Sequence, residues 1–157
     1  MFRMGRRLIT CPETKEAAAV KVKPLGELRL SACSRWPERA GCGQECLAQI
    51  ASSPDGCLVQ SIVTAWYAGK SCASCGRAIG KIAWHEAPPA LRAPDGTSFE
   101  WKDVAPQDLP RLFRTHQPLC WQCNNAAELA RIDPALPIRR THLAPPAAPL
   151  PVSRGVY

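Results

Sequence analysis

Cys72-Ala-Ser-Cys75-Gly76 and Cys120-Trp-Gln-Cys123 are the two stretches of sequence around which this chain is organised. Each holds two cysteines separated by two residues, a spacing that lets a tight turn present both sulfurs to one ion. Glycine accepts positive φ, so Gly76 allows the chain to turn sharply after the first pair. Two such pairs supply four thiolates, the number that a tetrahedral Zn²⁺ requires. The sequence therefore predicts a zinc site formed by Cys72, Cys75, Cys120 and Cys123.

The segment that contains both pairs, residues 70–131, resembles the treble-clef class of zinc fingers. The resemblance rests on CASCG as the zinc knuckle, on a hairpin between KIAWHE and SFEWKDV, and on CWQC at the start of a helix. It implies a small β-hairpin-plus-helix module that is stabilised by zinc. The class contains nucleic-acid binders, protein-interaction modules and nucleases, so the resemblance indicates metal binding and leaves the biological role open.

Turn signals and apolar periodicity predict an α+β fold of short elements. In the N-terminal half they indicate a hairpin over residues 7–24 and helices over residues 42–51 and 57–69. In the C-terminal half they indicate a strand over residues 81–86 and a hairpin that turns at Asp95-Gly96, with Phe99 and Trp101 on one face of its second strand. Two further helices are expected over residues 108–116 and 123–131.

The chain divides by composition into three parts. Residues 1–69 form a cysteine-rich N-terminal region, and residues 70–133 form the treble-clef-like module. Residues 134–157 are rich in proline and alanine, and proline removes main-chain donors, so we expect an extended or disordered tail there.

A second set of cysteines, Cys33, Cys42, Cys46 and Cys57, is spaced less regularly. On the predicted helix over residues 42–51, two of them would share one face and the other two would flank it. The set is a candidate for a second zinc ion or for an iron–sulfur cluster, and zinc is favoured because the spacing matches no common cluster motif. Alternatively, some of these cysteines are buried as small hydrophobic residues. Cys11 either replaces one member of the set or is a lone thiol.

The number of cysteines in the chain is nine, which does not suit complete disulfide pairing. The N-terminus has basic residues but no long apolar segment, so we expect no secretory signal and a cytoplasmic protein. In that reducing compartment clustered cysteines are metal ligands or redox groups more often than disulfides. An iron–sulfur or thiol redox protein that uses the N-terminal cysteines Cys33, Cys42, Cys46 and Cys57 is therefore an alternative. Two independent redox CxxC pairs are a separate reading, for which the βαβ context of a thioredoxin-type site is missing.

A degenerate nuclease of the HNH type is a further alternative, because nucleases of that type place a catalytic histidine between paired CxxC turns. The candidates in this chain are His85, Asn124 and Asn125. The acidic residue that usually precedes the histidine is replaced by Trp84, and a catalytic metal would lack ligands after Cys123. We therefore expect no enzymatic activity.

The formal net charge is +7, from 20 Lys and Arg against 13 Asp and Glu. This balance suits nucleic acid or another acidic partner, but the basic residues are scattered along the chain. No apolar run reaches the roughly 18 residues of a membrane-spanning helix. The sequence thus predicts a small zinc-binding interaction or adaptor module, whose partner is a protein or nucleic acid and whose oligomeric state is open.

Overall fold

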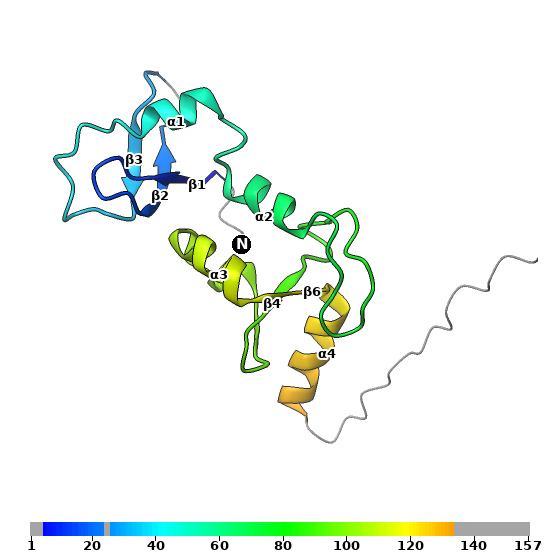
Figure 1. The fold of residues 1–157 in the computed structure, drawn as a ribbon. Helices are drawn as coiled ribbons and strands as arrows, with labels where there is room; N and C mark the ends of the chain where they lie inside the picture. The colour runs from blue at the N-terminus through cyan, green and yellow to red at the C-terminus, as the bar shows by residue number, and fades with distance from the viewer. Residues whose placement is uncertain (1–4, 24–25, 134–157) are drawn as a thin grey trace, which may run out of the picture.

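The computed structural model describes residues 5–23 and 26–133, and the tail expected over residues 134–157 lies outside them. Helices and two small antiparallel sheets are both present, which confirms the α+β class. Figure 1 shows one sheet with α1 at one end of the molecule and the second sheet with α4 at the other, with α2 between them. No helix in the described ranges is long and apolar enough to cross a membrane.

The N-terminal sheet has the order β1-β2-β3, formed by β1 (Arg7–Thr10), β2 (Ala17–Val22) and β3 (Leu30–Cys33). The predicted hairpin over residues 7–24 is confirmed, since β1 and β2 pair from Thr10 with Ala17 at the turn to Arg7 with Val20. The small side chains of Ala18 and Ala19 on β2 are buried. The buried core of this end consists of Ile9, Ala18, Val20, Leu30, Cys46 and Ile50.

The first helix is shorter than the sequence pattern predicts, because α1 spans Leu47–Ser52 instead of residues 42–51. Gln44 has a φ of 57°, a left-handed conformation that a right-handed helix does not contain. The helix consequently starts at Leu47, three residues after Gln44, with Cys46 at its N-cap. The prediction that Cys42 and Cys46 share a helical face is therefore wrong, and Cys42 lies in the preceding loop.

The helix predicted over residues 57–69 is confirmed as α2 (Val59–Tyr67). It is tied to the N-terminal sheet, since the Leu8 N–H donates to the Cys57 carbonyl at 2.8 Å and the Val59 N–H donates to the Arg6 carbonyl at 3.1 Å. Its buried face nevertheless packs on the C-terminal half. That shared core consists of Val59, Val63, Tyr67, Leu91, Trp101, Leu109 and Leu112. Because of this packing, α2 connects the two ends of the molecule.

The C-terminal sheet has the order β5-β4-β6, formed by β4 (Ala90–Arg92), β5 (Ser98–Phe99) and β6 (Gln117–Leu119). The hairpin that turns at Asp95-Gly96 is confirmed, with Gly96 at a φ of 89°. Two 3₁₀ turns, η1 (Trp101–Asp103) and η2 (Pro106–Asp108), lead into α3 (Leu109–Thr115), and β6 then leads into α4 (Trp121–Ile132). The helices predicted over residues 108–116 and 123–131 are thus confirmed, and β6 was not predicted.

Two details of the predicted C-terminal half are wrong. The strand expected over residues 81–86 is a series of turns, and its pairing is limited to an isolated bridge between Ala83 and Ala87. Phe99 and Trp101 do not share a face: Phe99 is 43% exposed, whereas Trp101 opens a 3₁₀ turn and is only 6% exposed. The indole of Trp101 donates to the buried Tyr67 hydroxyl at 3.2 Å, and this core contact takes Trp101 out of the strand.

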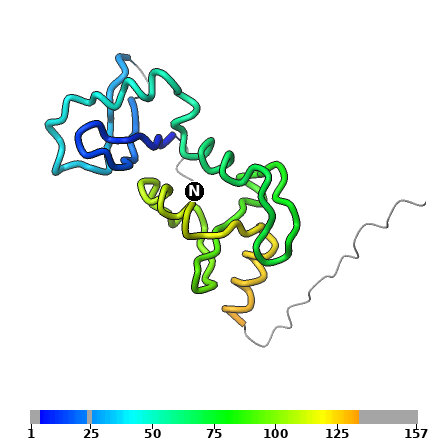
Figure 2. The backbone as a smooth tube through the Cα atoms, in the orientation of Figure 1, coloured from blue at the N-terminus to red at the C-terminus, as the bar shows by residue number. Residues whose placement is uncertain are grey.

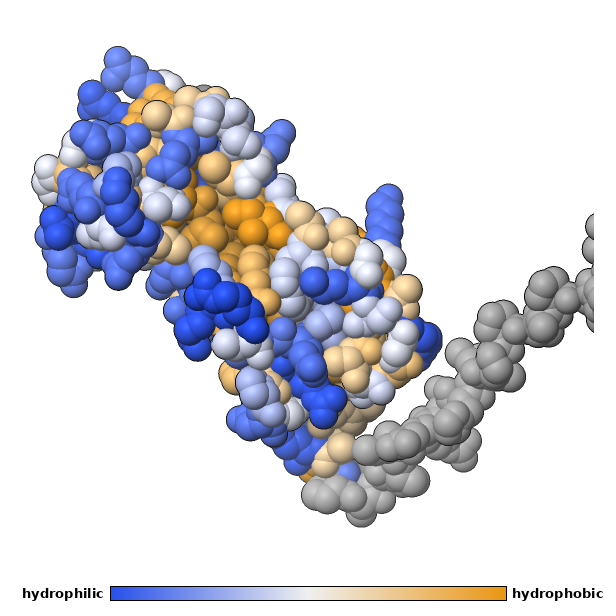
Figure 3. All heavy atoms as spheres, in the orientation of Figure 1, coloured by the Kyte–Doolittle hydropathy of each residue, from blue (hydrophilic) through white to orange (hydrophobic). Residues whose placement is uncertain are grey.

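Segments far apart in the sequence meet where the two ends join. The η2 turn contacts β2, and Figure 2 shows the chain before α3 approaching the N-terminal sheet. On the face drawn in Figure 3, apolar residues gather in the middle, between the more polar ends of the molecule.

Candidate metal centre

The first CxxC pair lies in a closed turn of the main chain. The Cys72 N–H donates to the Arg77 carbonyl at 2.8 Å, and the Gly76 N–H donates back to the Cys72 carbonyl at 2.9 Å. Gly76 has a φ of 73°, which is the conformation that its lack of a side chain allows. Ser71 and Ala78 pair across the base of the turn, so both sulfurs are presented from one rigid loop.

The second pair is brought to this turn by β6. The Ala73 N–H donates to the Pro118 carbonyl at 2.8 Å, which joins the first turn to β6. The next residues start α4, with Cys120 at its N-cap and Cys123 in its first turn. The Cys120 N–H donates to the Cys72 sulfur at 3.3 Å, a contact across 48 positions of sequence. The two pairs are therefore held together by the main chain itself.

The four sulfurs converge as the sequence predicts. The ligand atoms of Cys72, Cys75, Cys120 and Cys123 all lie within 4.8 Å of one another, and the Cys75 and Cys120 sulfurs are 3.8 Å apart. Cys72 is buried against Ala90 and Leu119, whereas Cys75 is exposed. Among the described residues, these four cysteines form the group of side chains whose ligand atoms lie close enough together to hold a metal ion.

Ionisation of the four thiols is unequal. Burial opposes ionisation of Cys75, but hydrogen bonds from the Arg77 main chain and guanidinium, and then from Cys123 and Cys72, lower the pKa of Cys75 to about 6. Burial raises the pKa of Cys120 to about 12, with hydrogen bonds to Cys123 and Cys72 contributing to the result. A bound cation favours ionisation of all four thiols, because the thiolate is the form that binds a metal and the proton is released on binding. Four converging thiolates suit a soft, tetrahedral ion such as Zn²⁺.

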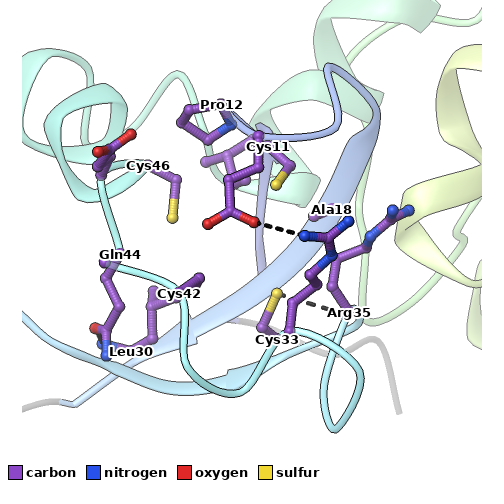
Figure 4. Close-up of a pocket in the computed structure, with 14 residues that line it drawn as sticks. Cys11, Pro12, Ala18, Leu30, Cys33, Arg35, Cys42, Gln44 and Cys46 are labelled. Atoms are coloured by element: carbon purple, nitrogen blue, oxygen red, sulfur yellow. Dashed lines mark hydrogen bonds and ion pairs between the residues drawn. The ribbon is translucent and has the colours of Figure 1, made fainter.

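The second set of cysteines is only partly brought together. Cys33, Cys42 and Cys46 line one pocket, and Cys11 lines it with them. Figure 4 shows these four side chains around the pocket. Burial raises the pKa of Cys46, and the negative charges of Cys33, Cys42 and Cys11 raise it further. Cys57 is not among the lining residues, and its sulfur lies 3.6 Å from the Gln49 carbonyl, with the geometry of a hydrogen bond.

The three residues considered for a nuclease also meet in space. His85, Asn124 and Asn125 line a second pocket of about 340 Å³ beside the start of α4. Asn124 is buried, with an exposed fraction of 6%, and its Oδ1 has no hydrogen-bond partner. The remaining lining residues are Trp84, Pro88, Pro89, Glu100, Trp101, Lys102 and Trp121.

Sequence reasoning did not predict that three tryptophans form walls of this second pocket. The sequence places Trp84 next to His85 and Trp121 three residues before Asn124. Tryptophan is common in protein cores, however, so these spacings did not distinguish a pocket wall from a core residue. The pocket does not assemble a metal site, because the ligand set found in the described residues is the four-cysteine group. Aromatic walls with amide groups suit a planar ligand that has hydrogen-bonding edges.

Comparison with known proteins gives no further guide to this chain. No family model, no curated protein and no solved structure matches it.

Proposed function

We propose that this chain is a zinc-stabilised, non-catalytic interaction module of the reducing cytoplasm. The observation that carries the proposal is the convergence of Cys72, Cys75, Cys120 and Cys123 within 4.8 Å. A C-terminal half with short strands and short helices buries little core, so a metal cross-link contributes much of its stability. Structural zinc contributes on the order of 10–16 kcal/mol in zinc-finger peptides.

The treble-clef assignment is supported by the order of the parts. A knuckle at residues 72–77 is followed by the β4–β5 hairpin and then by α4, whose N-cap and first turn supply the second pair of ligands. Zinc in this arrangement fixes the start of α4 against the sheet. The metal is therefore proposed to hold a helix in position and to take no part in chemistry.

The helix held in this way offers a surface for a protein partner. Trp121 is 37% exposed, Leu129 is 52% exposed and Ile132 is 77% exposed. Their spacing of eight and three residues places them on one side of α4. Exposed apolar side chains that share one face are typical of protein-binding surfaces. We propose a helical or grooved protein partner with an apolar contact face.

The zinc proposal is tested by measuring metal content and thermal unfolding of the full chain purified without oxygen. The variants Cys75→Ser and Cys120→Ser are expected to lose the zinc of this site and the cooperative unfolding of the C-terminal half. Cys57→Ser is the matched control, because Cys57 lies outside this cluster. Unchanged zinc content and melting in the two ligand variants would contradict the proposal.

The contact surface is tested with a photo-reactive amino acid at position 132, compared with one at the exposed position 21 on β2. We expect a discrete crosslinked protein from position 132 that disappears when Leu129→Glu is added. Equal crosslinking from both positions, or crosslinking insensitive to Leu129→Glu, would remove α4 as the contact surface.

A second candidate function is binding of single-stranded nucleic acid, favoured by the pocket that Trp84, Trp101 and Trp121 line beside Lys102. Base stacking on aromatic side chains contributes about 1–3 kcal/mol per base, so Trp121→Ala should weaken oligonucleotide binding about 5- to 150-fold. Phe99→Ala removes a similarly exposed aromatic outside the pocket and is the control. Fluorescence anisotropy at low salt is the measurement, and absence of binding or equal effects of the two variants would exclude this function.

A further inference from the structure

The turn that joins β1 to β2 repeats the main-chain pattern of the zinc knuckle at residues 72–77. The Cys11 N–H donates to the Glu16 carbonyl at 2.8 Å, and the Lys15 N–H donates to the Cys11 carbonyl at 2.8 Å. Thr10 and Ala17 pair across its base. The knuckle has the same three features at the same offsets from its first cysteine. The chain therefore builds this turn twice, each time around a cysteine.

The fifth residue of each turn adopts the same unusual conformation. In the knuckle this residue is Gly76 with a φ of 73°, and in the first turn it is Lys15 with a φ of 58°. A lysine with positive φ is uncommon, and such a residue persists where its surroundings impose the conformation. Thr14 occupies the place of the second knuckle cysteine, so this turn offers a single sulfur, that of Cys11.

The parts that follow the two turns also come in the same order. A hairpin follows each, β2–β3 in the first case and β4–β5 in the second. Each series ends with a cysteine at the N-cap of a helix, Cys46 for α1 and Cys120 for α4. In the first series two further cysteines are available near the helix, Cys33 at the end of β3 and Cys42 in the loop before α1. The Cys33 sulfur accepts the Arg35 N–H at 3.5 Å, the kind of contact that the Cys72 sulfur makes.

The pocket between these four cysteines is small. Its cavity volume is about 30 Å³, roughly the space of two water molecules, which is enough for a single ion. The charged residues that line the pocket are balanced, since Arg35 and Arg39 are matched by Glu13 and Glu45, and Arg35 is paired with Glu16. Arg39 is also paired with Glu13 at 3.2 Å on this rim.

We propose that Cys11, Cys33, Cys42 and Cys46 bind a second Zn²⁺, so that the chain contains two zinc-stabilised units with the same order of parts. Cys57 is not a ligand. In this structure no three of these four sulfurs lie close enough together to hold a metal ion, so binding requires the turn-rich segment over residues 34–46 to close on the ion. Binding exchanges four S–H protons for four Zn–S bonds and oxidises nothing.

The first test is the zinc content of the full chain after anaerobic purification, measured by plasma mass spectrometry. We expect two zinc ions per chain in the wild type and in Cys57→Ser, and one in Cys11→Ser and in Cys46→Ser. Cys75→Ser should also retain one, which separates this site from the four-cysteine centre of the C-terminal half. One zinc in the wild type that is lost in Cys75→Ser, or a loss in Cys57→Ser equal to that in Cys11→Ser, would overturn the proposal. Bound iron with visible absorption would overturn it as well.

The second test uses the wild type, so it does not depend on the folding of variants. Zinc-loaded protein is alkylated, digested and analysed by mass spectrometry to give the rate at which each cysteine reacts. We expect Cys57 to react and Cys11 to be protected at least tenfold relative to it, with protection lost when a chelator is added. Equal rates for Cys11 and Cys57 in the presence of zinc, or a disulfide that involves Cys11, would contradict the second site.

Discussion

Replacing Tyr67 by phenylalanine should destabilise the zinc-loaded protein, because its hydroxyl is a buried link between α2 and the C-terminal sheet. The hydroxyl donates to the Ala90 carbonyl and accepts the Trp101 indole N–H at 3.2 Å. The phenylalanine variant would lose the first bond, worth about 0.5–1.5 kcal/mol, and leave the indole N–H buried and unpaired, which costs about 1–3 kcal/mol. We therefore expect Tyr67→Phe to lower the free energy of unfolding by about 1.5–4.5 kcal/mol.

The measurement is urea unfolding at pH 7 with zinc present, followed by circular dichroism. The expected result is a lower midpoint with an unchanged m-value, since the fold and its buried surface are retained. Thr64→Ala is the control: Thr64 accepts the Trp84 indole N–H at 3.1 Å at an exposed site, and its loss should change stability by less than about 0.5 kcal/mol. A loss in Tyr67→Phe no larger than that of the control would refute the reasoning.

The same hydroxyl gives a pH dependence of known sign. Burial raises the pKa of Tyr67 far above its ordinary value of 10.0, while the hydrogen bond with Trp101 opposes the shift. An unfolded tyrosine releases its proton near pH 10, whereas the folded one keeps it, so the folded wild type loses stability as the pH rises above 10. Tyr67→Phe lacks this contribution. The difference in stability between the two proteins should therefore narrow above pH 10, and a constant difference from pH 8 to pH 11 would contradict the pKa shift.

Three further outcomes are expected. Gly76→Ala places a side chain at a φ of 73° and should cost about 1–2 kcal/mol of stability in thermal unfolding, whereas Gly80→Ala, with open space and no positive φ, should leave the melting temperature nearly unchanged. Leu91→Ala empties a fully buried site and should lower the free energy of unfolding in urea by about 2–5 kcal/mol; a loss below about 1 kcal/mol would show that the site collapses. Burial and then the charge of Arg111 lower the pKa of His116, so the native state loses stability as the pH falls below 6.5. An NMR titration should show a higher His116 pKa in Arg111→Ala, and an unchanged pKa would exclude the charge effect.

Local sequence patterns were sufficient for the C-terminal metal centre. Both CxxC pairs, the hairpin turn at Asp95-Gly96 and the start of α4 depend on a few neighbouring residues, so spacing identified the four ligands. The convergence of the two pairs depends on β6, which the sequence did not predict. The same kind of reasoning failed over residues 81–86. Alternating apolar residues there fit a strand, but Pro88 and Pro89 follow closely, and the segment forms turns that line a pocket.

The N-terminal cysteines could not be sorted by spacing. Cys57 is nearer in sequence to Cys46 than Cys11 is, yet Cys11 reaches the pocket through the pairing of β1 with β2 and Cys57 does not line it. Sequence distance carries no information on this, because sheet pairing is a long-range property. The left-handed conformation of Gln44, which delays the start of α1, is likewise set by its surroundings: its side chain accepts the Leu30 N–H at 3.0 Å.

The position of α2 has a consequence for how the two ends of the molecule lose their structure. This helix is joined to β1 by main-chain hydrogen bonds, but Val63 and Tyr67 are buried in the core of the opposite end. Cleavage after Gly69 would therefore separate a helix from the side chains that cover it and expose apolar surface on both fragments. In the zinc-loaded wild type, melting that begins at either end passes through α2 to the other end, so this form should unfold in a single cooperative transition.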